Sequence, residues 1–113
     1  MEFGEYQKKS RVTALYNDAG KNFIYPTLGL AGETGEVVEK IKKLIRDGSA
    51  YEPAQVSKEK KTEIAKEMGD VVWYLAQLAT EFELSFDDIA AQNLEKLMSR
   101  LDRGVIGGDG DNR

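Results

Sequence analysis

Two pairs of carboxylates at the same spacing are the residues of this sequence most able to do chemistry. Glu33 and Glu36 form one pair, and Glu67 and Asp70 form the other. Residues three positions apart lie on the same side of an α-helix, so each pair would project from one flank. Four converging carboxylates repel one another and raise each other's pKa values unless a cation lies between them. The pattern therefore predicts a metal site with oxygen ligands.

The segments around the two pairs repeat each other, and this repeat fixes where the acids stand. LAGETGEVVEKIKKLI (Leu30–Ile45) matches IAKEMGDVVWYLAQLA (Ile64–Ala79). In both segments the acid pair lies on the same flank of an apolar stripe, so antiparallel packing would bring the four acids together. Glycine within a helix costs about 1 kcal/mol relative to alanine. Gly35 and Gly69, at matching positions, therefore indicate that the backbones approach closely or that something lies against them.

The composition narrows the choice of metal. The chain has no cysteine and no histidine, which removes zinc hydrolase sites, cysteine nucleophiles and Ser/His/Asp triads. A di-iron bundle needs Glu-x-x-His ligands and is excluded for the same reason. Oxygen ligands suit Mg²⁺, Mn²⁺ or Ca²⁺, and Mg²⁺ typically keeps waters and leaves room for substrate phosphates. Solvated surface charge is the competing interpretation of the acids.

The overall charge and hydropathy restrict the partners. A formal net charge of −4 argues against a nucleic-acid groove, which usually presents a basic stripe to phosphates. No apolar run approaches transmembrane length, and the first residues do not resemble a signal peptide. We therefore expect a cytoplasmic protein that binds neither nucleic acid nor membrane.

The acids need helices to hold them, and the sequence predicts an all-α fold, an antiparallel four-helix bundle. Apolar residues recur at helical spacing, and no strand-like alternation of useful length occurs. The predicted helices cover roughly residues 2–17, 28–47, 58–83 and 85–103. The length of 113 residues suits one domain, residues 1–113.

Capping residues mark the ends of these helices. Gly48 is a C-terminal signal for the second helix, while Ser57 and Ser85 are N-cap residues for the third and fourth. A polar linker around Ser49–Ser57 joins the second helix to the third. The glycine-rich tail, residues 104–113, is expected to be flexible.

Further polar side chains are candidates for binding phosphate. Asn93, Lys96 and Arg100 share one flank of the fourth predicted helix, and an amide with two cations suits a polyphosphate. An exposed basic edge that balances the acidic helices is an equally good interpretation. Lys40 lies one turn beyond Glu36 and is either a phosphate contact or a surface lysine. Aromatic residues that could influence base preference, or simply fill the core, are Tyr16, Phe23 and Tyr25.

Together these residues resemble the E-x-x-E and E-x-x-D signature of the MazG-like nucleotide pyrophosphohydrolases. The signature stands in LGLAGETGEVVEKIKK and EMGDVVWYLAQLA, and NLEKLMSR follows. The resemblance covers roughly Leu28 to Arg113. The linker between the acid pairs is longer than in many members, which should change the loop rather than the metal site.

The resemblance implies a Mg²⁺-dependent enzyme, with Mn²⁺ as a substitute, that cuts a nucleoside triphosphate into a monophosphate and pyrophosphate. It also implies a homodimer or a dimer of dimers. One carboxylate, Glu33 or Glu36, would take the proton of the attacking water. Asn93 and Lys96 match nucleotide-contacting positions, and Arg113 would close over phosphate. The implied metal ligands are Glu33, Glu36, Glu67 and Asp70.

Several functions remain open at this point. Cleaning of the nucleotide pool is the first. A dUTP- or dCTP-specific pyrophosphatase and a phosphoribosyl-ATP pyrophosphohydrolase are sister activities that would use the same acids. A non-catalytic helical interaction module, with the acids as surface charge, is the alternative from another class. It predicts neither stabilisation by Mg²⁺ nor release of pyrophosphate.

Overall fold

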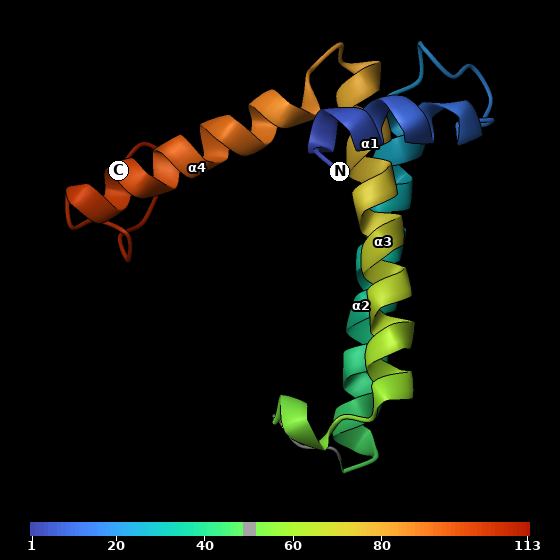
Figure 1. Ribbon diagram of the computed structural model, residues 1–113, viewed down its shortest axis with the longest axis vertical. Helices are drawn as coiled ribbons and strands as arrows, with labels where there is room; N and C mark the ends of the chain where they lie inside the picture. Colours follow the sequence, from blue (N-terminus) through green and yellow to red (C-terminus); the bar gives the residue numbers. More distant parts are fainter. Residues whose placement is uncertain (49–51) are drawn as a thin grey trace.

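The computed structural model describes residues 1–48 and 52–113, so the beginning of the predicted linker, residues 49–51, lies outside the described residues. The expected all-α class is confirmed: the described residues form four α-helices and two short 3₁₀ turns, without a strand (Figure 1). The elements are α1 (Phe3–Ser10), η1 (Arg11–Thr13), α2 (Ile24–Arg46), η2 (Pro53–Gln55), α3 (Lys58–Glu81) and α4 (Phe86–Asp102).

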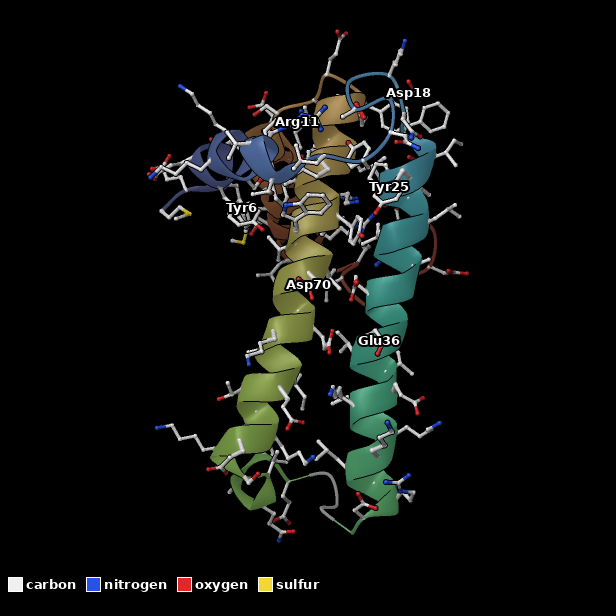
Figure 2. All side chains as sticks on the ribbon, turned by 90° about the vertical axis from the view of Figure 1, so that its right-hand side faces the viewer. Tyr6, Arg11, Asp18, Tyr25, Glu36 and Asp70 are labelled. Carbon is white, nitrogen blue, oxygen red and sulfur yellow. The ribbon has the colours of Figure 1, made fainter. Side chains whose placement is uncertain are left out.

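The centre of the fold is a hairpin of two long helices. α2 and α3 lie side by side and run in opposite directions (Figures 1 and 2), as the repeated apolar stripes predict. Leu44 is buried between them, and Val37 and Val71 are half-buried. Ile41 and Leu75, which belong to the same stripes, stay 41% and 38% exposed. The hairpin therefore covers only part of its apolar surface.

Local signals explain where the helices begin and end. The Ser57 and Ser85 hydroxyls accept the backbone N–H groups of the first turns of α3 and α4, as predicted. Gly48 follows α2 with a φ of +85°, a left-handed conformation that suits glycine. α2 begins at Ile24, earlier than expected, because Pro26 lies in the first turn, where its missing N–H has no helical partner to lose.

The first helix is shorter than predicted. α1 ends at Ser10, and only η1 continues it as far as Thr13. The Ser10 hydroxyl donates to the carbonyl of Gln7, and the Thr13 hydroxyl donates to that of Ser10. Such local bonds compete with continued helix. The chain then turns back across the open end of the hairpin instead of completing the expected turns up to residue 17.

A buried polar network fastens this end of the molecule. The Glu81 side chain is fully buried and accepts the N–H groups of Gly20 and Asn22 and the hydroxyl of Tyr16. Gln77, also fully buried, donates to the Ser10 hydroxyl and accepts from Arg11. These bonds hold the loop after η1 against α3.

The last helix stands apart from the hairpin. α4 leaves the end of α3 and projects sideways, contacting mainly α1 near its own beginning (Figure 1). The Cα radius of gyration is 17.0 Å, whereas a compact domain of this length has about 13 Å. Large apolar side chains of α4 therefore stay exposed, namely Leu94, Leu97, Met98 and Leu101.

Residues 104–113, which we call the tail, turn back along α4 (Figure 1). The tail contains no helix, as expected, but it is tied to α4 by hydrogen bonds. The Val105 N–H donates to the carbonyl of Arg100, and the Arg103 guanidinium donates to the carbonyl of Arg113. Within the described residues, no helix combines the length and the apolar character needed to cross a bilayer.

Candidate active site

Three of the four predicted acids meet between the hairpin helices. Glu33 comes from α2, and Glu67 and Asp70 come from α3. One carboxylate oxygen of each lies within 4.8 Å of the corresponding oxygens of the other two. Glu33 and Glu67 are half-buried and Asp70 is exposed. We call this set the acid triplet. It offers the hard oxygen donors that Mg²⁺, Mn²⁺ and Ca²⁺ prefer.

The fourth acid stands beside the triplet and not within it. Glu36 lies one turn beyond Glu33 on α2, and its side chain is exposed. Figure 2 shows Glu36 on α2 and Asp70 on α3, the two neighbouring helices of the hairpin. Three of the four acids therefore converge, and Glu36 lies outside this group with an exposed side chain.

The electrostatics of the triplet call for a cation. Partial burial raises the pKa of the Glu33 carboxyl above its ordinary value, and the charges of Asp70, Glu67 and Glu36 raise it further. The amine of Lys40 is 4.0 Å from Glu67 Oε1 and 3.8 Å from Glu63 Oε2. A single shared lysine leaves the cluster with excess negative charge. The residues present thus fit a divalent ion, because it would neutralise more of that charge than one ammonium group can.

Lys40 lies at the border of the acid triplet. Beyond the acid cluster it lines a cavity of about 350 Å³ together with Lys43 and Lys60. Its ion pairs are long, and its side chain is 34% exposed. The structure therefore places this predicted substrate contact at the border of the triplet.

Aromatic residues that the sequence reasoning did not single out adjoin the same acids. Burial raises the pKa of the Tyr74 hydroxyl, and so do Tyr25 and the charges of Glu33 and Asp70. Gly29 makes room for the Tyr74 ring, since a Cβ added to this glycine would collide with it. The only sequence signal was spacing, because Gly29 precedes Glu33 by one turn and Tyr74 follows Asp70 by one turn.

The aromatic residues considered from the sequence lie in the same region. Tyr25 stacks on Tyr16 with ring centroids 4.7 Å apart, and Tyr25 as a whole residue stays 45% exposed. Phe23 stacks on Phe82 at 5.1 Å. Figure 2 shows Tyr25 near the beginning of α2, at the same end of the hairpin as α1.

One interpretation of the glycines is wrong. A Cβ added to Gly35 or Gly69 would meet nothing within 4 Å. The two backbones therefore do not approach closely at these positions within the described part of the chain. The alternative, that something outside the chain lies against them, stays a prediction.

The predicted residues of α4 and the tail do not join the acid triplet within one chain. α4 projects away from the hairpin, and Asn93 is exposed on it. The Lys96 amine instead donates to Asp111 at 2.9 Å. The Arg113 guanidinium donates to the carbonyl oxygens of Val105 at 3.0 Å and Ile106 at 3.1 Å, inside the tail itself.

Comparison with known proteins identifies the family that this fold and these acids indicate. Residues 26–105 match the family model of the MazG nucleotide pyrophosphohydrolase domain. The chain therefore belongs to the MazG nucleotide pyrophosphohydrolase family. The matched range contains the acid triplet, Glu36, Lys40 and all of α4.

A curated relative extends the likeness to nearly the full length. The chain is 42% identical over 113 residues to the Gene 37 protein of Mycobacterium phage L5, and the match covers 96% of each chain. The name of that relative states no activity. No solved structure matches. Family membership supports a nucleotide pyrophosphohydrolase in general, and the acid triplet agrees with the dependence of the family on a divalent metal.

Proposed function

We propose that this chain is a Mg²⁺-dependent nucleoside triphosphate pyrophosphohydrolase. It would convert an NTP or dNTP and water to the monophosphate and pyrophosphate, a reaction suited to cleaning the nucleotide pool. The observation that carries the proposal is the acid triplet, in which Glu33, Glu67 and Asp70 bring carboxylate oxygens within 4.8 Å. This donor set lies in a chain of the MazG family.

The residues around the triplet have separate roles in this reaction. Bound Mg²⁺, or Mn²⁺ in its place, would neutralise phosphate charge and lower the pKa of the attacking water. Glu33, Glu67 and Asp70 would hold the ion. Glu36 is exposed at the edge of the triplet and accepts the proton as water attacks the α-phosphorus. Lys40 donates to the phosphate chain, from which pyrophosphate leaves.

The position of α4 supports a shared site in a homodimer or a dimer of dimers. α4, the helix that carries Asn93 and Lys96, projects away from the hairpin that carries the triplet (Figure 1). A second copy of the chain would have two effects. It would cover exposed apolar side chains of both α4 and the hairpin, such as Leu94 and Val38. It would also bring the basic flank of α4 to the acidic hairpin.

The test is release of pyrophosphate by the purified chain. We expect Mg²⁺-dependent release from canonical or damaged (deoxy)nucleoside triphosphates, and loss of release in EDTA. Asp70→Asn should lower activity by at least about a hundredfold, because the triplet loses a metal ligand. Glu59→Gln is the matched control, since Glu59 is an exposed acid of the first turn of α3, and it should leave activity unchanged.

Other outcomes separate the remaining possibilities. A strong preference for dUTP, dCTP or phosphoribosyl-ATP would assign the chain to one of the sister activities. Orthophosphate as the first product would contradict cleavage between the α- and β-phosphates. A helical interaction module would release no pyrophosphate, and Mg²⁺ would not raise its melting temperature.

A further inference from the structure

The tail places a carboxylate on two cations of α4. Asp111 Oδ1 accepts hydrogen bonds from Lys96 Nζ at 2.9 Å and from Arg100 Nη2 at 3.1 Å. Arg100 Nη2 also donates to the Asp111 carbonyl at 2.6 Å. Lys96 and Arg100 are one turn apart on α4, so a single anion reaches both. These two positive charges are thus already occupied from within the chain.

Arg100 is built into this position, whereas Asp111 is not. The side chain of Arg100 is only 6% exposed, but that of Asp111 is 77% exposed. The Nε atom of Arg100 is buried and has no hydrogen-bond partner in the described part of the chain. A carboxylate held at the surface can leave without opening a core, while the guanidinium stays. Nε is a donor that Asp111 does not use, and it stays available to another anion that reaches it.

The turn of the tail does not depend on Asp111 alone. The backbone N–H of Val105 donates to the carbonyl oxygen of Arg100 at 2.9 Å, and the backbone N–H of Gly108 donates to the carbonyl oxygen of Val105 at 3.1 Å. The Arg113 side chain adds bonds to the carbonyl oxygens of Val105 and Ile106. Gly110, directly before Asp111, has a φ of +82°, which glycine adopts without strain. Asp111 can therefore swing away while most of the tail keeps its fold.

We propose that Lys96 and Arg100 form a phosphate-binding pair that Asp111 occupies until the substrate displaces it. The tail then competes with the triphosphate for the side chains of Lys96 and Arg100. The identity of the displacing anion rests on the proposed function, since phosphate oxygens accept from guanidinium and ammonium groups as a carboxylate does. Removal of the Asp111 charge should strengthen phosphate binding, whereas a purely structural anchor would lose tail order and bind phosphate no better.

The experiment measures binding of inorganic tripolyphosphate in Mg²⁺ by calorimetry. We expect Asp111→Asn to bind about two- to fivefold tighter than the natural chain, the range that an exposed ion pair supports. Asp109→Asn is the matched control. It removes the same charge from the same tail, but Asp109 Oδ1 accepts only the neighbouring Gly110 N–H in the described part of the chain. Its affinity should not change.

A second pair of variants ties the gain to the named cation. In an Arg100→Gln background, Asp111→Asn should bring no gain, because the shared partner is missing. Circular dichroism of every variant checks that the helices persist. Unchanged or weaker binding by Asp111→Asn, or an equal gain from Asp109→Asn, would overturn the proposal. If Asp111→Asn binds tripolyphosphate more tightly but the chain has no pyrophosphohydrolase activity, the phosphate-binding pair is supported and the proposed function is contradicted.

Discussion

At the scale of residues, the acids were the most predictable part of the site. The i, i+3 spacing placed each pair on one flank, and the repeat placed the two flanks opposite each other. The spacing could not separate Glu36 from the triplet, because the exact rotation of one helix against the other decides which oxygens meet. Tyr74 and Gly29 were missed for a similar reason. Their contact is between helices, and within each segment only the one-turn spacing from an acid pointed to it.

A prediction at this scale concerns Glu81 and pH. Burial alone would raise the pKa of its carboxyl, but the N–H of Gly20, the Tyr16 hydroxyl and the charge of Arg11 together lower it below the ordinary 4.5. The ionised form is therefore favoured by folding. Its contribution to stability is complete above the ordinary pKa and is lost as the pH falls through the lower folded-state pKa.

Urea unfolding across this acidic range checks the prediction. At neutral pH, Glu81→Gln should lower the free energy of unfolding by about 2 kcal/mol, since buried bonds to a charged acceptor are lost. The difference between the two proteins should shrink as the pH falls below 4.5. A variant as stable as the natural chain at neutral pH would contradict the role of Glu81, and Glu59→Gln serves again as the control.

At the scale of elements, helix type and order followed from the sequence, and helix ends followed where a cap was present. Ser57 and Ser85 marked the starts of α3 and α4 correctly. The predicted start of the second helix, residue 28, was too late because proline is tolerated in the first turn of a helix, and Pro26 lies in the first turn of α2. The early end of α1 goes with the local hydroxyl bonds of Ser10 and Thr13, which the spacing of apolar residues does not report.

The contact between α2 and α3 predicts that alanine substitutions at two glycines change the stability of the chain in opposite directions. Gly29→Ala should destabilise the chain by about 1–3 kcal/mol, because the added Cβ collides with the Tyr74 ring. Gly32→Ala, where a Cβ meets nothing within 4 Å, should stabilise it by up to about 1 kcal/mol. Thermal and urea unfolding measure both. Equal stabilisation of the two variants would mean that the ring does not pack on Gly29.

At the scale of the whole molecule, the open shape was the feature that the sequence left unseen. An apolar stripe on α4 predicts that the helix packs on a hairpin. It does not specify whether that hairpin belongs to the same chain or to a second copy of the chain. Either arrangement buries the same side chains, so the pattern of residues is the same for both. The radius of gyration of 17.0 Å is that of an open chain, in which α4 stands away from its own hairpin (Figure 1).

Complementation between two inactive variants tests this choice. Mixing Asp70→Asn with Lys96→Gln should restore about a quarter of the natural activity, because half of the randomly formed dimers would carry one intact shared site of two. The same mixture of Asp70→Asn with Glu67→Gln should stay inactive, since both changes strike the same hairpin. If neither mixture regains activity and light scattering shows that the chain is a monomer, the site is not completed by a partner.

The direction of α4 depends on a single strained joint. Glu83, between α3 and α4, has a φ of +57°, which costs a residue other than glycine roughly 1–2 kcal/mol. The N–H groups of Glu83 and Leu84 hold the joint by donating to Thr80 at 3.0 Å and to Ala79 at 2.8 Å. Glycine here would relieve the strain but give the arm freedom to swing. The glutamate thus restricts the direction that α4 can take relative to α3.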